Sequence, residues 1–160
     1  MSTNGFTTCL WFDGEAEAAA DYYLSVFKDG RILRTAYYNE AGPGPVGSVM
    51  IVEFEINGQK FVGLNGGPEF HFTEAISFQI HCADEAEADY YWEALTRDGG
   101  QEVACGWLKD KFGLSWQVVP PGAIDLISDP DPARAARATA AMMTMVKLDV
   151  AAMRRAADGD

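Results

Sequence analysis

The sequence predicts an α+β fold of two tandem modules followed by a C-terminal helix, and two observations lead to this prediction. The first is an internal repeat, because DGEAEAAADYY at residues 13–23 is echoed by ADEAEADYY at residues 83–91. The second is that each copy follows a short apolar run, at residues 9–12 and at residues 76–80. A strand-then-helix unit is therefore repeated. This predicts a pseudo-twofold domain with a ligand site in the cleft between the copies.

The first module is predicted as one strand, one helix and three strands. Apolar side chains recur at helical spacing up to Phe27, and Gly30 stands where such a helix would stop. Residues 48–56 alternate between an apolar face and a face with Glu53 and Glu55, which we expect to be solvated. The dipeptide Asn-Gly that follows is the preferred type I′ hairpin turn. The helix is expected at 15–27, and the strands at 9–12, 31–38, 48–56 and 59–65.

The second module is predicted to repeat this order. Asp84 can cap a helix, with Glu87 completing a capping box, and the pair Gly99-Gly100 ends that helix. Further strands are expected at 102–108 and 114–119, joined by a turn within 109–113. The Ala- and Met-rich tail reads as one helix over 131–157, started by an Asp cap with Pro inside it. We predict one domain over 1–160, with module one at about 5–68, module two at about 74–122 and the helix at about 131–157.

Composition excludes several classes of protein. A chain of 160 residues with 48% hydrophobic and 22% charged residues can bury one ordinary core. The formal charge of -12, with only 12 scattered Lys and Arg residues, disfavours a nucleic-acid partner. No apolar run approaches the roughly 20 residues that cross a bilayer, and the N-terminus lacks a signal-peptide pattern, so we expect a cytoplasmic protein without a membrane partner. Three cysteines without CxxC spacing indicate neither a disulfide framework nor a zinc ribbon.

Several stretches of the chain resemble a known family. They are the repeated βαβββ order, the NGGP that closes the first half, CGWLKDKFGLSWQ at 105–117, LWFDG at 10–14 and the tail around 142–152. Together they resemble the PhnB-like branch of the vicinal-oxygen-chelate superfamily, which includes glyoxalases, bleomycin-resistance proteins and extradiol dioxygenases. The resemblance implies cupped mixed sheets and a homodimer. Members of this branch are often labelled 3-demethylubiquinone methyltransferases. A doubly wound methyltransferase needs a Gly-rich turn between a strand and a helix, whereas the Gly-rich loop 42–47 lies between two predicted strands.

The resemblance also implies where a site would lie. In metal-using members, ligands from the first and last strand of each half converge on one divalent ion. The positions that match in this chain are Thr7 or Cys9, Asn65, Ser77 or Gln79, and Gln117. Amides and hydroxyls are weak ligands for catalytic Zn, Fe or Mn. The chain therefore departs from the metal pattern, which favours a site without a metal cofactor.

Three other residues are weaker candidates for a metal-binding or nucleophilic role. His71 follows the Asn65 loop, and His81 falls two residues after Gln79 on the same strand face, so each is a weak candidate metal ligand together with Gln117. Cys105 lies near two lysines that would favour a thiolate, but no histidine is placed beside it, so a packing role is favoured.

The predicted site is a pocket of aromatic area and short polar groups. Aromatic side chains on or near the sheets come from Trp11, Phe61, Phe78, Trp107, Phe112 and Trp116, and the polar groups from Asn65, Ser77, Gln79, Ser115 and Gln117. Among these, the predicted ligand-binding residues are Asn65, Ser77, Gln79, Trp107, Trp116 and Gln117. Two functions stay open. One is a metal-free, homodimeric small-molecule-binding protein. The other is a divalent-metal isomerase, lyase or dioxygenase that uses His71 or His81 with Gln117 and Asn65.

Overall fold

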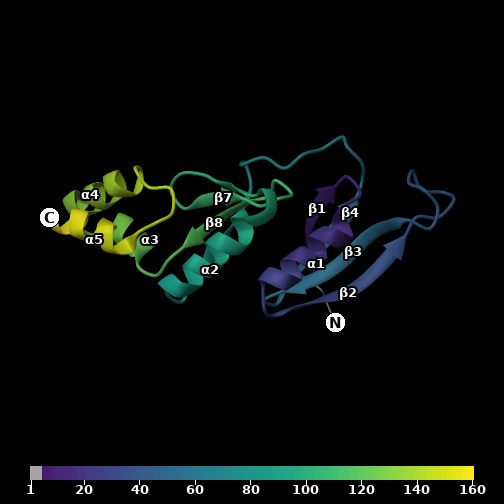
Figure 1. The fold of residues 1–160 in the computed structure, drawn as a ribbon, viewed down its shortest axis with the longest axis horizontal. Coiled ribbons are helices and arrows are strands. Elements are labelled where there is room, and N and C mark those ends of the chain that lie inside the picture. Colours follow the sequence, from purple (N-terminus) through teal and green to yellow (C-terminus); the bar gives the residue numbers. More distant parts are fainter. Residues whose placement is uncertain (1–4) are drawn as a thin grey trace. The chain divides into compact units, whose positions relative to one another are not determined.

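The computed structural model describes residues 5–160, and the chain divides after His71 into two compact units (Figure 1). The first unit contains strands β1 (Thr8–Phe12), β2 (Gly30–Tyr37), β3 (Val49–Ile56) and β4 (Gln59–Asn65), with helix α1 (Ala16–Val26). Its sheet has the order β1-β4-β3-β2, in which β1 runs parallel to β4 and the other neighbours are antiparallel. The predicted strand, helix and three strands are confirmed.

Helix α1 covers one face of the first sheet. Period-2 alternation turns Val52, Phe54 and Ile56 toward the helix, and all three are buried. The ring of Phe54 stacks on Phe61 at 5.4 Å and on Tyr23 of α1 at 6.2 Å. The opposite, open face holds the charges, where Glu53 and Glu55 of β3 pair with arginines of β2. These glutamates lie outside the core as predicted, in ion pairs at the surface.

The second unit repeats the topology of the first. It contains β5 (Ser77–His81), α2 (Glu85–Thr96), a 3₁₀ turn η1 (Arg97–Gly99), β6 (Gln101–Glu102), β7 (Trp107–Lys109) and β8 (Ser115–Val119). The sheet order is β5-β8-β7-β6, with β5 parallel to β8. Two mixed four-stranded sheets, each with a helix, confirm the predicted α+β class with two βαβββ modules.

Helix α2 begins as the sequence predicts. The Asp84 carboxylate accepts a hydrogen bond from the Glu87 backbone N–H at 2.8 Å, and the Glu87 carboxylate accepts one from the Ala83 N–H at 2.6 Å. With 12 residues α2 is short, and none of the helices within residues 5–160 is long and apolar enough to cross a membrane.

The single strand predicted at 102–108 is wrong. The segment forms two short strands, β6 and β7, separated by a tight turn. Cys105 and Gly106 adopt φ angles of 59° and 80° in this turn, a left-handed conformation that differs from the extended backbone of a regular strand. The apolar run hid this turn because only one of its two left-handed residues is glycine.

The single C-terminal helix predicted at 131–157 is also wrong, although the segment is helical. It forms α4 (Pro132–Met142) and α5 (Val150–Asp158), preceded by a short helix α3 (Ala123–Ile127) that the sequence did not indicate. The chain leaves the helix between α4 and α5, where the carbonyls of Met145 and Val146 accept hydrogen bonds from the Cys105 and Gly106 N–H groups. Asp149 then caps α5 through the Ala152 N–H at 2.9 Å.

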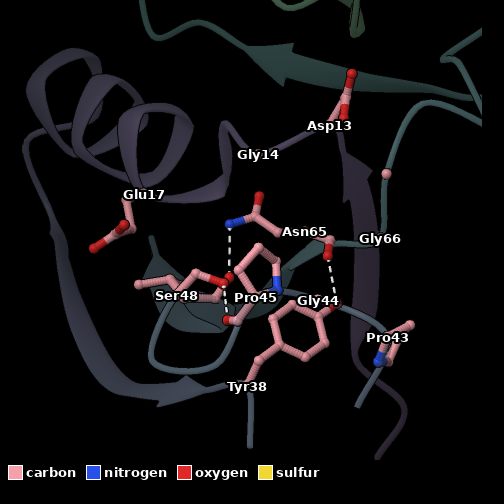
Figure 2. Close-up of a pocket in the computed structure, with 12 residues that line it drawn as sticks. Asp13, Gly14, Glu17, Tyr38, Pro43, Gly44, Pro45, Ser48, Asn65 and Gly66 are labelled. Carbon is pink, nitrogen blue, oxygen red and sulfur yellow. Dashed lines mark hydrogen bonds between the residues drawn. The ribbon is translucent and has the colours of Figure 1, made fainter. Parts of the chain in front are cut away.

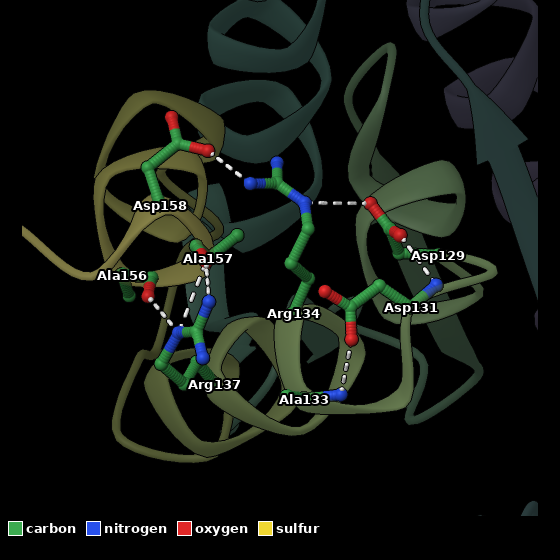
Figure 3. A network of polar contacts seen from close by, with 8 residues as sticks. All are labelled: Asp129, Asp131, Ala133, Arg134, Arg137, Ala156, Ala157 and Asp158. Carbon is green, nitrogen blue, oxygen red and sulfur yellow. Dashed lines mark hydrogen bonds and ion pairs between the residues drawn. The ribbon is translucent and has the colours of Figure 1, made fainter.

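Two arginines of α4 tie the C-terminal helices together (Figure 3). The Arg137 guanidinium donates to the carbonyls of Ala156 and Ala157, which lie at the C-terminal end of α5. Arg134 lies between Asp129 and Asp158 and forms an ion pair with each. Beneath these contacts the helices enclose a small core of their own, in which Met153 is fully buried and Met142 and Met145 are partly buried.

Burial of Cys82 gives a testable pH dependence of stability. Burial, helped by the nearby charge of Glu87, raises the pKa of the Cys82 thiol to about 11. The folded chain then keeps this proton at pH values where the unfolded chain, with an ordinary pKa, has lost it. The raised pKa of Cys82 therefore contributes about 2 to 3 kcal/mol to the free energy of unfolding. This contribution is fully present below about pH 8.5 and is lost as the pH rises toward 11.

Urea unfolding of the wild type and of Cys82→Ala across this alkaline range measures the effect. We expect the free energy of unfolding to fall more steeply with pH in the wild type than in the variant. Parallel curves for the two proteins would contradict the raised pKa.

Candidate functional site

Four of the predicted ligand-binding residues meet on the open face of the second sheet. Helix α2 covers the opposite face, where Leu108 and Val118 are buried. On the open face the Gln79 side chain donates to Gln117 Oε1 at 3.2 Å, and Gln117 Nε2 donates to Ser77 Oγ at 2.8 Å. The strand register places Trp107 of β7 directly beside Gln117. We call Ser77, Gln79, Trp107 and Gln117 the polar cluster.

A second row of side chains lies on the same face, two residues along each strand from the row of Gln79, Gln117 and Trp107. Ser115 of β8 lies opposite Ser77 of β5 and opposite Lys109 of β7. Ser115 is only 1% exposed, and its hydroxyl has no hydrogen-bond partner within residues 5–160. The Lys109 ammonium pairs with the Glu74 carboxylate, and the hydrogen bond from Lys109 is the main cause that lowers the pKa of Glu74.

Trp116 is not part of this face, which corrects its predicted role in ligand binding. It is 5% exposed, its ring lies 5.4 Å from Phe78, and its indole N–H donates to the Asp110 carboxylate at 2.9 Å. Successive strand residues point to opposite faces, so Trp116 cannot share the face of Gln117. It is a core residue whose indole N–H is satisfied inside the fold.

Asn65 belongs to the first unit, whereas the polar cluster belongs to the second unit. Its Oδ1 accepts from the Ala16 N–H at 2.8 Å, and its Nδ2 donates to the Val49 carbonyl at 3.1 Å. The amide therefore caps the start of α1 and ties it to β3. This structural role leaves less of the side chain for a ligand than the sequence implied.

Asn65 also lines a pocket of about 470 Å³ beside the Gly-rich loop (Figure 2). Tyr38 is buried there, and its hydroxyl donates to the Asn65 carbonyl at 2.6 Å. A Cβ at Gly42 or Gly44 would lie 2.7 or 2.4 Å from the Tyr38 ring, so both positions require glycine. The loop therefore connects two strands and packs on a tyrosine, as expected of a hairpin loop.

The two histidines are far weaker candidates than the polar cluster. His71 is exposed in the first unit beyond β4, and His81 is exposed at the end of β5, on the face of Gln79. Within residues 5–160, no three His, Cys, Asp or Glu side chains come together in a group that could hold a metal ion. The polar cluster itself offers the amides of Gln79 and Gln117 and the hydroxyl of Ser77.

Cys105 is held by the turn between β6 and β7. Its N–H donates to the Met145 carbonyl at 2.8 Å, and its sulfur lies 3.8 Å from the sulfur of Met143. These contacts support the packing role predicted for this residue.

Comparison with known proteins shows which family this chain resembles in sequence and fold. The sequence profile of the 3-demethylubiquinone-9 3-methyltransferase family matches residues 4–119. The chain belongs to this PhnB-like family. A PhnB protein from Bacillus cereus, whose name assigns it provisionally to the same methyltransferase activity, is 34% identical to this family member. The two structures align over 73% of this chain and 99% of the Bacillus protein, with a TM-score of 0.66.

More distant structures show the fold alone. A Pseudomonas aeruginosa protein aligns with this PhnB-like chain at 18% identity and a TM-score of 0.60, over 74% of this chain and 98% of its own. The fosfomycin resistance protein FosX from Mesorhizobium loti aligns at 13% identity and a TM-score of 0.53, over 74% and 92%. No curated protein matches the chain. The predicted vicinal-oxygen-chelate fold is confirmed.

The family match ends where the second sheet ends. Helices α3, α4 and α5 follow residue 119, beyond the part that the family profile covers. The resemblance of residues 142–152 to the PhnB-like branch therefore stays a prediction.

Proposed function

We propose that this PhnB-like protein binds a small organic molecule on the open face of its second sheet. The observation that carries the proposal is the polar cluster, in which Ser77, Gln117 and Gln79 form a hydrogen-bonded chain beside the half-buried Trp107 ring. Ligand sites combine apolar and aromatic area with a few convergent polar groups that orient the ligand. The cluster offers this combination, with a ring for stacking and amides that both donate and accept.

We further propose that binding needs no metal. Catalytic Zn, Fe and Mn sites use imidazoles and carboxylates, since neutral amides and hydroxyls do not offset the cost of stripping water from the ion. The side chains that hydrogen bonds join on this face are those of Ser77, Gln79 and Gln117. The chemistry of these donors supports a metal-free site.

A divalent-metal isomerase, lyase or dioxygenase is the second candidate. The observation that favours it is the placement of His81 on the strand face of Gln79 and next to the polar cluster. Such an enzyme would need His81 and Gln117 to converge on one ion together with a further ligand.

Methyl transfer is not part of the proposal, despite the name of the family. The doubly wound fold of the usual methyltransferase holds its cofactor at a Gly-rich turn between a strand and a helix. In this chain the Gly-rich loop joins β2 to β3, two antiparallel strands.

We propose a homodimer as the assembly. Strand β2 is an edge strand of the first sheet, and Ile32, Leu33 and Tyr37 on it are exposed. Apolar edge strands of this kind are paired or covered in stable proteins. A second copy of the chain supplies such a cover with the twofold symmetry that most homo-oligomers have.

Metal content and ligand binding of the purified chain test these proposals together. We expect no stoichiometric ion by elemental analysis before or after incubation with Zn, Mn, Fe and Ni. In a screen of aromatic amides and acids followed by NMR, we expect hits to shift the Gln117 side-chain amide, and Gln117→Leu to weaken them about tenfold. Gln59→Leu, at an exposed position of the first unit, is the matched control. Analytical ultracentrifugation of the same sample measures the assembly.

A stoichiometric ion that disappears in His81→Ala would establish the metal-dependent alternative. Hits that Gln117→Leu and Gln59→Leu weaken equally would place the ligand elsewhere.

A further inference from the structure

We infer that the ligand of this PhnB-like protein carries an oxyanion, which Ser77, Ser115 and Lys109 bind, and that the Glu74 carboxylate occupies Lys109 until the ligand displaces it. The inference rests on the proposed function, because it assigns the chemical class of the ligand at the same open face. The shared chemistry is a carboxylate or a phosphonate group.

The first observation is the unpaired hydroxyl of Ser115. It is buried and has no partner within residues 5–160. A buried polar group without a hydrogen bond costs free energy, so such groups are rare and call for an explanation. A ligand oxygen that accepts from this hydroxyl in the bound state would remove the cost.

The second observation is the row of donors that includes Ser115. Its neighbours in the register are Ser77 on one side and Lys109 on the other, each on an adjacent strand. Directly opposed residues have Cβ atoms about 5 Å apart, within the span of one carboxylate or phosphonate. Ser77 Oγ accepts from Gln117 Nε2, so its own hydrogen remains available to donate. The row therefore presents two hydroxyl donors and one ammonium.

The third observation is that a carboxylate already pairs with this row. Glu74 comes from the connecting segment before β5 and pairs with Lys109, and the Glu74 side chain is 58% exposed. Exposed ion pairs are weak and exchange with solvent ions. The Glu74 carboxylate therefore occupies the position of the ligand oxyanion beside Lys109. An oxyanion that also contacts Ser77 and Ser115 displaces it.

The net charge of the chain disfavours non-specific binding of anions. With a formal charge of -12, the surface as a whole repels anions. Specific anion binding then requires a built site, and the row of Ser77, Ser115 and Lys109 is such a site.

Titration of the full chain with three probes tests the inference. The probes are benzoate, phenylphosphonate and the neutral benzamide, followed by two-dimensional NMR at neutral pH and constant ionic strength. We expect the anions to shift the resonances of β5, β7 and β8 and to bind more tightly than benzamide. The preferred anion identifies a carboxylate or a phosphonate ligand.

Four variants assign the residues. Glu74→Gln should tighten anion binding about two- to fivefold, because it removes the competing carboxylate. Lys109→Gln should weaken it about tenfold or more, and Ser115→Ala about two- to tenfold, without a lower Tm for Ser115→Ala since its hydroxyl is unpaired. Lys111→Gln, which makes the same charge change two residues further along the chain, is the control and should have little effect.

Unchanged or weaker anion binding in Glu74→Gln would overturn the inference, as would equal losses in Lys109→Gln and Lys111→Gln. Benzamide binding as tightly as benzoate at the polar cluster would overturn the inference but leave the proposed function intact. If none of the probes shifts the open face, the oxyanion inference fails, and the proposed function fails with it if the wider screen also finds no ligand there.

Discussion

Replacing Asp110 with alanine is expected to lower the free energy of unfolding by about 3 to 5 kcal/mol. Asp110 is 2% exposed, and its carboxylate accepts hydrogen bonds from the Phe112 N–H at 2.9 Å, the Leu114 N–H at 3.1 Å and the Trp116 indole at 2.9 Å. Alanine removes the acceptor of these bonds, two of which close the turn between β7 and β8. Chemical denaturation monitored by tryptophan fluorescence measures the loss.

Two further variants show whether the effect comes from these bonds. Asp110→Asn keeps one oxygen acceptor but presents an amide N–H to one of the donors, so we expect a smaller loss than for alanine. Asp21→Ala, at an exposed position of α1, removes the same group and should change stability by less than about 0.5 kcal/mol. A loss at Asp110→Ala no larger than this control would contradict the role of the carboxylate.

Replacing Met153 with alanine is expected to destabilise the C-terminal helices by about 2 to 5 kcal/mol. Met153 of α5 is 0% exposed and lies in the small core that also contains Leu126 of α3 and Ala138 of α4. The substitution leaves a cavity among the three short helices. Hydrogen exchange of the α4 and α5 amides, read by NMR or mass spectrometry, measures the change.

Met143→Ala is the matched control, because Met143 is 63% exposed and leaves no cavity. We expect faster exchange in α4 and α5 only for Met153→Ala. The first unit should be unaffected, since the small core belongs to the second unit. Equal acceleration in both variants would show that the buried thioether is not what holds these helices.

Most of the candidate site could be predicted from the sequence, because its residues lie on strands that short-range sequence patterns indicate. Ser77, Gln79 and Gln117 lie on strands whose positions the apolar runs and the family resemblance indicated, and period-2 alternation sends all three to one face. Trp116 was wrongly grouped with them. The same alternation contains the correction, because adjacent residues such as Trp116 and Gln117 cannot face one ligand together.

Other features of the site needed contacts between segments far apart in the chain. The burial of Ser115, the pairing of Lys109 with Glu74 and the capping of α1 by Asn65 all join residues that no local period connects. The break between α4 and α5 is of the same kind. Residues 143–149 follow a helical pattern in sequence, but carbonyls there serve the distant turn at Cys105.

The sequence by itself determined the module order, the helices α1 and α2, the Asn57-Gly58 hairpin and the family, because each depends on short-range periodicity, turn chemistry or motif wording. Only the tertiary structure decided which side chains are buried, which buried hydroxyl within residues 5–160 lacks a partner and where the C-terminal helix breaks. These depend on parallel pairing of strands such as β5 and β8, whose residues are 38 positions apart in the chain, and such pairing is set by packing of the whole unit.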